Sequence, residues 1–279
     1  MIIKTDAQTM YRDYYEKLKE NEALNQLIIS DLHLMLEEEG DPHDFLAVQT
    51  HGGEVRYFIC NYLPYNMVVL PADPEKEEDA ELYGKELAEY LLQGEHTICG
   101  IQSSASYAKG FLSVYPGLEK SIGMSVMSSS HIQYYPPEGT VYLATDDDTG
   151  VLSEMLKDFK QEVLHKEISR EEAENDILNK MNKEDTLFYI YEVDGRILGM
   201  TCSTRKLSEG RTLNYVFIDR DCRNRGYGKQ MVSTVSRRMI DSGCRYISLY
   251  ADRSSTYANK LYRDVGFEVL MDVDTYKVK

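Results

Sequence analysis

A short, charged glycine turn between a strand and a helix constrains the fold of this chain more than any other stretch. The turn reads Arg223-Asn224-Arg225-Gly226-Tyr227-Gly228. Residues 213–218 before it are rich in β-branched and aromatic side chains, as expected for a buried strand. Apolar residues after it recur at helical spacing, at Met231, Val232, Val235 and Met239. The chain therefore has to place a buried strand directly before a helix N-terminus, which is a feature of α/β folds.

This turn has the chemistry of a phosphate-binding site. Its two glycines, Gly226 and Gly228, allow backbone N–H groups to approach a ligand closely. The helix start adds unpaired N–H donors and the positive end of the helix dipole. Arg223, Arg225 and Lys229 add full positive charges. The sequence therefore predicts a phosphate or pyrophosphate bound at this helix N-terminus.

The glycine spacing decides which kind of phosphate loop this is. No Gly-Lys-Ser/Thr follows at the spacing of a P-loop, and the third glycine of the dinucleotide fingerprint is missing. The turn instead resembles the Arg/Gln-x-x-Gly-x-Gly/Ala loop of the GNAT acyltransferases, which binds the pyrophosphate of acetyl-CoA. A second motif of that family follows, Leu261-Tyr262-x-x-x-Gly266-Phe267, on a predicted strand (246–250) and helix (255–265). The resemblance covers residues 140–279.

Two domains are expected, with a boundary in the proline-rich stretch 134–139. For residues 140–279 the order β-α-α-β-β-β-α-β-α-β is predicted, ending in a strand pair over 267–278, and it matches the acyltransferase fold. Residues 1–139 are expected to form a second α/β domain. A divergent copy of the acyltransferase fold would fit this order of elements. The overall class predicted is α/β with a mixed sheet. In the first domain we expect two helices within 7–39, ended by the acidic stretch 37–42, a hairpin over 45–60, a helix over 81–92 and strands at 67–70, 98–101 and 121–127.

The resemblance also implies roles for individual residues. Phe217 and Ile218 would offer main-chain groups to the pantetheine arm and the thioester. Tyr262 stands where the family has a tyrosine facing the thioester sulfur, and a phenol is a reasonable general acid toward a thiolate. The alternative for Tyr262 is a core aromatic beside Leu261. The implied cofactor-binding set is Phe217, Ile218, Arg223, Asn224, Arg225, Gly226, Tyr227, Gly228, Lys229 and Ser255, with Ser255 also able to cap the last helix.

The general base stays unassigned. Some members of the family carry a glutamate on the cofactor strand, whereas this strand offers only Thr212, Asn214 and Tyr215. A water molecule, or loss of the proton before binding, would suffice. No metal is expected, since the six histidines show no ligand spacing and the run Asp146–Asp148 is typical of a solvated turn and helix cap. Cys222 lacks the His or acid of a nucleophilic pair.

Charge and composition limit the partners. The net charge is −16, of which residues 1–139 carry −14, and this balance disfavours nucleic-acid binding. No apolar run is long enough to span a bilayer, and the N-terminus lacks a signal-peptide core. The five widely spaced cysteines indicate reduced thiols. We therefore expect a cytoplasmic protein without membrane or nucleic-acid partners.

These observations predict an acetyl-CoA-dependent N-acetyltransferase that acts on a primary amine of a small molecule or peptide. The rival interpretation is a non-catalytic CoA-binding module that regulates or binds a partner. Retention of Tyr262 favours the enzyme, and the missing carboxylate leaves room for the rival. The sequence leaves the acceptor and the oligomeric state, including a homodimer, open.

Overall fold

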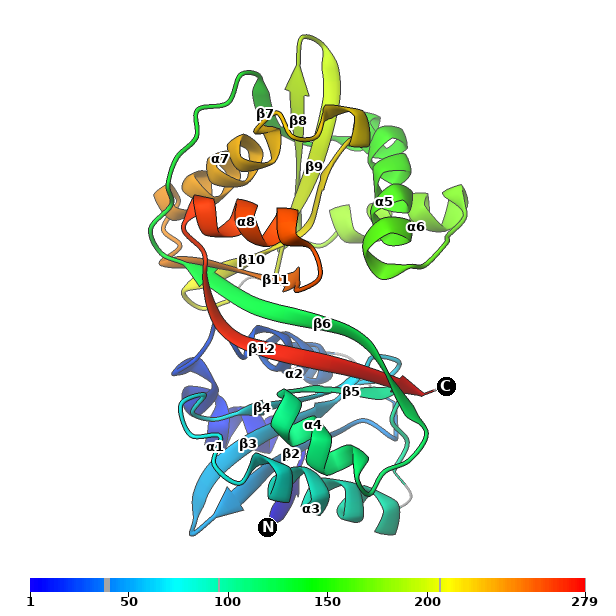
Figure 1. Cartoon of the computed structure of the whole chain (residues 1–279), viewed down its shortest axis with the longest axis vertical. Helices are drawn as coiled ribbons and strands as arrows, with labels where there is room; N and C mark the ends of the chain where they lie inside the picture. The colour runs from blue at the N-terminus through cyan, green and yellow to red at the C-terminus, as the bar shows by residue number, and fades with distance from the viewer. Residues whose placement is uncertain (38–40, 95, 206, 279) are drawn as a thin grey trace. The chain divides into compact units, whose positions relative to one another are not determined.

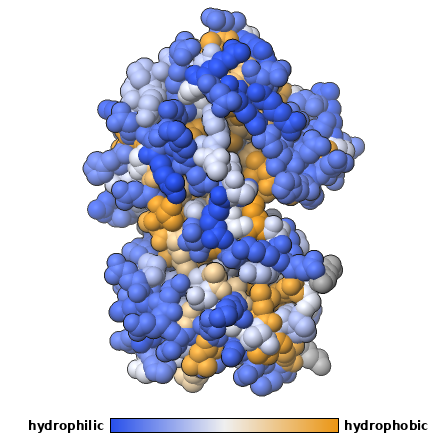
Figure 2. Space-filling model, viewed as in Figure 1, coloured by the Kyte–Doolittle hydropathy of each residue, from blue (hydrophilic) through white to orange (hydrophobic). Residues whose placement is uncertain are grey.

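The computed structural model of the protein describes residues 1–37, 41–94, 96–205 and 207–278. The chain divides into two compact units (Figure 1). The first unit comprises Met1–Val126 and Val269–Lys279, and the second unit comprises Met127–Glu268. Hydrophilic side chains cover much of the visible surface, including that over helices α5 and α6 of the second unit (Figure 2).

These units differ from the division expected at residue 139. The proline-rich stretch belongs to the second unit, where the Tyr135 amide donates to Ser233 Oγ (3.1 Å) and the Tyr135 hydroxyl donates to the Asp264 carbonyl (3.2 Å). The last eleven residues return to the first unit, because Asp274–Lys277 pair with Gly100–Ser103. A proline-rich stretch indicates irregular structure but does not by itself mark a domain boundary. Long-range contacts decided which unit each of these two segments joins.

The first unit begins with a strand, two helices and a three-stranded antiparallel meander. Its sheet has the order β1-β2-β3-β4-β5-β12-β6, in which β4 and β5 run parallel. Aromatic and aliphatic side chains from this sheet, α3 and α4 form one core. The elements are β1 (Ile2–Thr5), α1 (Ala7–Lys19), α2 (Gln26–Glu37), β2 (Phe45–His51), β3 (Glu54–Asn61), β4 (Met67–Pro71), α3 (Ala80–Gln93), β5 (Gly100–Ser103), α4 (Ala105–Leu112) and β6 (Leu118–Ser129).

The sequence did not predict β1 or α4. Helix α4 has only eight residues and contains Gly110, which lowers helix propensity. Its stability comes from packing, since a Cβ on Gly110 would lie 1.9 Å from the carbonyl oxygen of Glu81 in α3. Residues 38–40 of the acidic stretch that was expected to end α2 lie outside the described residues.

The second unit follows the predicted order closely. Its strands run β11-β10-β9-β8-β7, with β10 and β11 parallel and the others antiparallel. The predicted final strand pair is wrong, since a single strand, β12, covers Glu268–Val278. The elements are β7 (Thr140–Leu143), α5 (Thr149–Leu164), α6 (Arg170–Met181), β8 (Leu187–Val193), β9 (Arg196–Thr204), β10 (Gly210–Ile218), α7 (Tyr227–Asp241), β11 (Tyr246–Asp252) and α8 (Thr256–Val265).

Helices cover both faces of the sheet in the second unit. The apolar faces of α7 and α8 pack with Leu213 and Leu249 in one core. Those of α5 and α6 pack with Phe188 and Phe217 in the other. The predicted mixed α/β architecture is therefore confirmed for this unit, and the structure adds that helices cover both faces of the sheet. Within the described chain, no helix is both long and apolar enough to cross a membrane.

Candidate active site

The sheet of the second unit opens between β10 and β11. Their parallel pairing joins Gly210–Leu213 to Tyr246–Leu249. Both strands then continue, β10 to Ile218 and β11 to Asp252, with no further pairing between them among the described residues. On its other side β10 stays paired with β9 up to Ile218. The edge of β10 that faces β11 therefore presents backbone groups to a ligand.

A β-bulge directs the side chains of β10 at this opening. The register with β9 shifts between Asn214 and Phe217, and Tyr215 takes a left-handed conformation with φ 51°. Side chains alternate along a strand, so Leu213 and Phe217 would share one face without the extra residue. They instead enter opposite cores, and Phe217 faces α5 and α6.

The ring of Tyr215 anchors this bulge. It contacts Phe159 of α5 edge-on at 5.4 Å between centroids and stacks on Phe188 at 6.3 Å. The Lys180 ammonium lies 5.8 Å from its centroid. A left-handed aromatic residue costs about 1–3 kcal/mol, and these contacts offset that strain. Strain held in place next to an opening in the sheet is typical of a functional site.

A pocket of about 310 Å³ lies at this opening. It brings together Phe217, Ile218, Arg223, Asn224, Ser255 and Tyr262 from the set predicted by sequence. The other predicted residues, Arg225 to Lys229, do not line it and lie in the adjoining loop and first turn of α7. The remaining lining residues are Glu162, Val163, Val216, Tyr257, Ala258 and Leu261.

The start of α7 provides unpaired amides beside this pocket. Gly226 is the N-cap with φ 87°, and the first helical bond runs from the Gln230 amide to the Gly226 carbonyl (3.1 Å). In the described chain the amides of residues 224–229 have no acceptor. Such a row of N–H groups at a helix N-terminus attracts an anion.

The two glycines of this loop do different work. Gly226 has open space around its Cα but a φ that side chains rarely adopt. Gly228 is helical and buried, and a Cβ there would lie 2.5 Å from Leu261 Cδ1. The second glycine therefore allows α7 to approach α8, and its predicted role in opening the backbone to a ligand stays a prediction.

Known proteins share this architecture and part of this sequence. Residues 151–267 match the acetyltransferase (GNAT) family. They form a GNAT domain. An acetyltransferase from Yersinia pestis is 25% identical over 97 residues, which are 35% of this chain and 68% of that protein. One from Pectobacterium atrosepticum is 26% identical over 99 residues, 36% and 70% of the two chains.

Solved structures extend the likeness to the first unit. A GNAT-family acetyltransferase from Colwellia psychrerythraea aligns over 100% of both chains with a TM-score of 0.57 and 10% identity. A GCN5-related N-acetyltransferase from Sphaerobacter thermophilus covers 88% of this chain and 84% of its own, with a TM-score of 0.55 and 17% identity. At these identities the likeness concerns the fold alone. The predicted GNAT resemblance and fold class are confirmed, and acyl transfer is the reaction class that the family supports.

Most cations of the GNAT loop already have partners within the domain. Lys229 pairs with Asp264 (3.2 Å) and lies 5.0 Å from the centroid of the Tyr135 ring. Arg225 is exposed and has no ion pair among the described residues. Of the three predicted phosphate-binding cations, Arg225 is therefore the most available to an incoming ligand.

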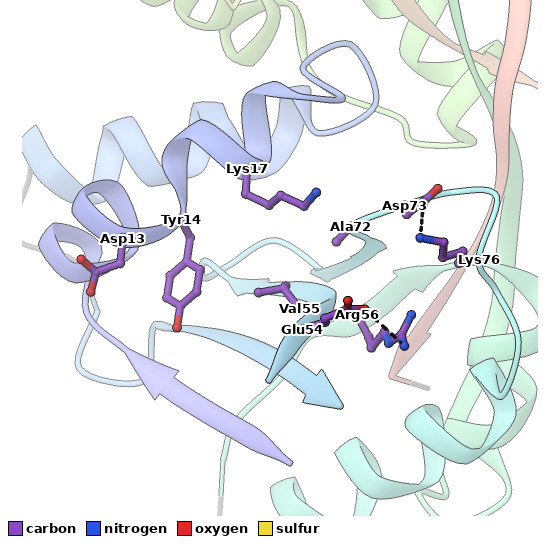
Figure 3. A pocket seen from close by; sticks show the side chains of 9 residues that line it. All are labelled: Asp13, Tyr14, Lys17, Glu54, Val55, Arg56, Ala72, Asp73 and Lys76. Atoms are coloured by element: carbon purple, nitrogen blue, oxygen red, sulfur yellow. Dashed lines mark ion pairs between the residues drawn. The ribbon is translucent and has the colours of Figure 1, made fainter. Parts of the chain in front are cut away.

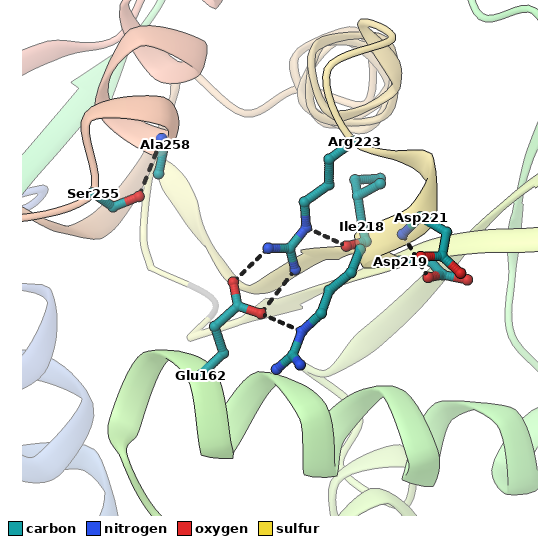
Figure 4. A network of polar contacts seen from close by, with 8 residues as sticks. Glu162, Ile218, Asp219, Asp221, Arg223, Ser255 and Ala258 are labelled. Atoms are coloured by element: carbon teal, nitrogen blue, oxygen red, sulfur yellow. Dashed lines mark hydrogen bonds and ion pairs between the residues drawn. The ribbon is translucent and has the colours of Figure 1, made fainter.

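Arg223 forms a bidentate pair with Glu162 of α5 (Figure 4). Its Nη1 and Nη2 donate to the two carboxylate oxygens at 2.6 and 3.0 Å, and Arg220 Nε adds a third bond at 3.1 Å. The hydrogen bonds from Arg223 lower the pKa of Glu162, so this carboxylate is charged at neutral pH. Sequence reasoning missed Glu162, because nothing local in an amphipathic helix points to a partner 61 positions later.

Tyr262 is both a core residue and a pocket residue. Only 7% of it is exposed, and its ring meets Phe267 edge-on at 5.9 Å between centroids. Burial raises the pKa of the Tyr262 phenol above its usual value, so the proton stays on the oxygen at neutral pH. Ser255 caps α8 by accepting the Ala258 amide (3.3 Å), which fixes the helix that carries Tyr262.

A second pocket, of about 410 Å³, lies in the first unit between α1, β3 and the chain after β4 (Figure 3). Lys76 pairs there with Asp73 (3.1 Å), and Arg56 lies 3.5 Å from Glu54. Its cations are thus balanced by neighbouring carboxylates. No group of three or more His, Cys, Asp or Glu side chains among the described residues could hold a metal ion.

Proposed function

We propose that the GNAT domain moves an acetyl group from acetyl-CoA to a primary amine by direct attack on the thioester. The observation that carries this proposal is that three features lie in or beside one pocket: an open strand edge, unpaired helix-start amides and a protonated phenol. A pocket of about 310 Å³ suits the thioester end of the cofactor, while the loop beside it suits the pyrophosphate.

The cofactor would be held mainly by backbone groups. The unpaired amides after Asn224 and the charges of Arg225 and Lys229 would bind the pyrophosphate. Main-chain groups of Phe217 and Ile218 at the end of β10 would bind the pantetheine arm and polarise the thioester carbonyl. The Ile218 carbonyl is not among them, because it already accepts a hydrogen bond from Arg223 Nε (2.9 Å). These contacts leave the reacting carbon between β10 and Tyr262.

The chemical step then needs one proton donor from the protein. The amine nitrogen attacks the carbonyl carbon, a tetrahedral intermediate forms, and the carbon–sulfur bond breaks. The departing thiolate takes the phenolic proton of Tyr262, which later recovers a proton from solvent. The nitrogen loses its extra proton to water, and the products are an N-acetyl amine and CoA thiol.

No side chain of the pocket is suited to act as general base. Glu162 is the one acid among the pocket residues, and the lowered pKa that Arg223 imposes makes it a weak base. The acceptor would therefore have to lose its ammonium proton before the attack. We expect the rate to rise with pH until the free amine predominates, and not to fall up to about pH 10, because the raised pKa of Tyr262 keeps the phenol protonated.

A panel of amines tests the proposal directly. The full chain is incubated with acetyl-CoA and each amine, and free thiol is measured over time at several pH values. Thiol release that depends on an amine, together with an acetylated product by mass spectrometry, would support the enzyme. CoA binding by calorimetry without turnover on any amine would favour the non-catalytic binding module instead.

A further inference from the structure

Arg223 directs its hydrogen bonds to the wall of the pocket. Besides the two bonds to Glu162, its Nε donates to the carbonyl of Ile218 at 2.9 Å. Its guanidinium carbon also lies 5.3 Å from the centroid of the Phe217 ring. Three of the five N–H donors of the side chain are thus engaged by the domain itself.

The groups that Arg223 contacts line the pocket in which the thioester end of the cofactor is proposed to lie. Ile218 is the last residue of β10, on the edge left open by β11, and Phe217 precedes it. Glu162 lies on α5 next to Val163, and both line the pocket. One planar guanidinium therefore joins the end of β10 to helix α5, which also lines the pocket (Figure 4).

We propose that Arg223 and Glu162 are positioning residues that set the thioester end of the cleft, and that Arg223 does not bind the pyrophosphate. Arg223 fixes the carbonyl and ring at the end of β10, and Glu162 fixes the plane of the guanidinium. The inference rests on the proposed function of the pocket. A bidentate pair of partly shielded groups, with side-chain exposures of 27% and 33%, holds its geometry better than a pair fully in water.

The effect of a substitution at Glu162 on CoA affinity has opposite signs for the two possible roles of Arg223, pyrophosphate binding and positioning. If Arg223 gripped the pyrophosphate, Glu162→Gln would release it and remove a negative charge near a polyanion, so CoA would bind more tightly. If the pair positions the cleft, Glu162→Gln weakens CoA binding, by about three- to tenfold, because the strand end loses its support. Isothermal calorimetry with CoA measures the difference.

Arg223→Lys gives a second, independent comparison. Lysine keeps the charge but lacks the planar fork and the Nε–H group that bonds Ile218. Positioning predicts that Arg223→Lys loses about tenfold in CoA affinity, as much as Arg223→Gln does. The double variant Arg223→Gln/Glu162→Gln should then be no weaker than the worse single variant, because the two residues act as one unit.

Glu154→Gln is the matched control for the removed charge. Glu154 lies two turns earlier on α5, is exposed, pairs with Lys157 (3.2 Å) and does not line the pocket. This variant should bind CoA as the parent does or slightly more tightly. The difference between Glu162→Gln and Glu154→Gln therefore isolates the hydrogen bonds to Arg223 from long-range charge.

Tighter CoA binding by Glu162→Gln, or affinity retained in Arg223→Lys, would overturn the positioning role. Circular dichroism and the thermal midpoint of each variant establish that it is folded. If the parent protein itself binds no CoA, the proposed function fails. If the parent binds CoA but substitutions at Arg223 and Glu162 leave the affinity unchanged, only the positioning role fails.

Discussion

The two units repeat one order of elements but differ where a cofactor would bind. Each has a strand, two helices, three strands, a helix, a strand and a helix, and in each the fourth and fifth strands are parallel. The loops after these fourth strands, residues 72–78 and 219–225, have the same length. Both lead to a left-handed N-cap, Asp79 with φ 63° and Gly226 with φ 87°.

The two units differ at these matching positions in the charge of the loop and in one tyrosine hydroxyl. Residues 72–79 carry five carboxylates and one lysine, whereas 219–226 carry three arginines and two aspartates. Seven residues after the capping serine of the last helix, the second unit has Tyr262 after Ser255 and the first has Phe111 after Ser104. The first unit thus keeps the loop length and the left-handed N-cap of such a site while lacking the positive loop and the phenol. We expect it to bind no CoA.

The largest effect, on the turnover number, is expected when Tyr262 is replaced by phenylalanine, the residue at the matching position Phe111 of the first unit. Tyr262→Phe keeps the ring that packs on Phe267 and removes the proton donor, so the turnover number should fall about 100-fold or more. The KM for acetyl-CoA should change little. Steady-state kinetics with an amine identified from the panel measure both quantities.

Tyr135→Phe serves as the control for a lost tyrosine hydroxyl. It deletes a hydrogen bond to the Asp264 carbonyl (3.2 Å) in the same unit, outside the pocket. Its turnover should stay near that of the parent. An equal rate for Tyr262→Phe, with chemistry shown to be the slow step, would return Tyr262 to a role in the core alone.

A somewhat smaller effect is expected from transferring the acidic N-cap. Gly226→Asp puts the counterpart of Asp79 where the pyrophosphate is proposed to bind, and CoA affinity should fall about 100-fold through like-charge repulsion. Gly226→Asn has the same shape, tolerates the left-handed conformation and carries no charge, so its loss should be about tenfold or less. Equal affinities in the two variants, measured by calorimetry, would contradict an anion site at this N-cap.

The smallest effect concerns how the paired helices pack in each unit. A Cβ on Gly110 would meet backbone, the Glu81 carbonyl oxygen at 1.9 Å, whereas one on Gly228 would meet the flexible end of Leu261. Gly110→Ala should therefore destabilise the first unit by about 2 kcal/mol, and Gly228→Ala should change stability by less than about 1 kcal/mol. Urea unfolding of both variants tests this, and equal losses would mean that Leu261 cannot move aside.

The sequence by itself determined the elements that depend on near neighbours. The strand before Arg223, the helix after Gly226 and the serine caps of α6 and α8 follow from propensity, glycine conformation and capping, which act within a few residues. The GNAT domain was recognisable for the same reason, since each of its two motifs lies within one strand–turn–helix segment.

Only the tertiary structure decided which distant groups meet. The pairing of β12 with β5 placed the C-terminal strand in the first unit, against a boundary inferred from local prolines. Packing of α8 against α7 gave Gly228 its role. The tie from Arg223 to Glu162 depends on α5 lying beside the end of β10, and no local pattern records which carboxylate a guanidinium will reach. Contacts of this kind depend on how the helices and strands pack, because residues far apart in the sequence come within hydrogen-bonding distance only in the folded structure.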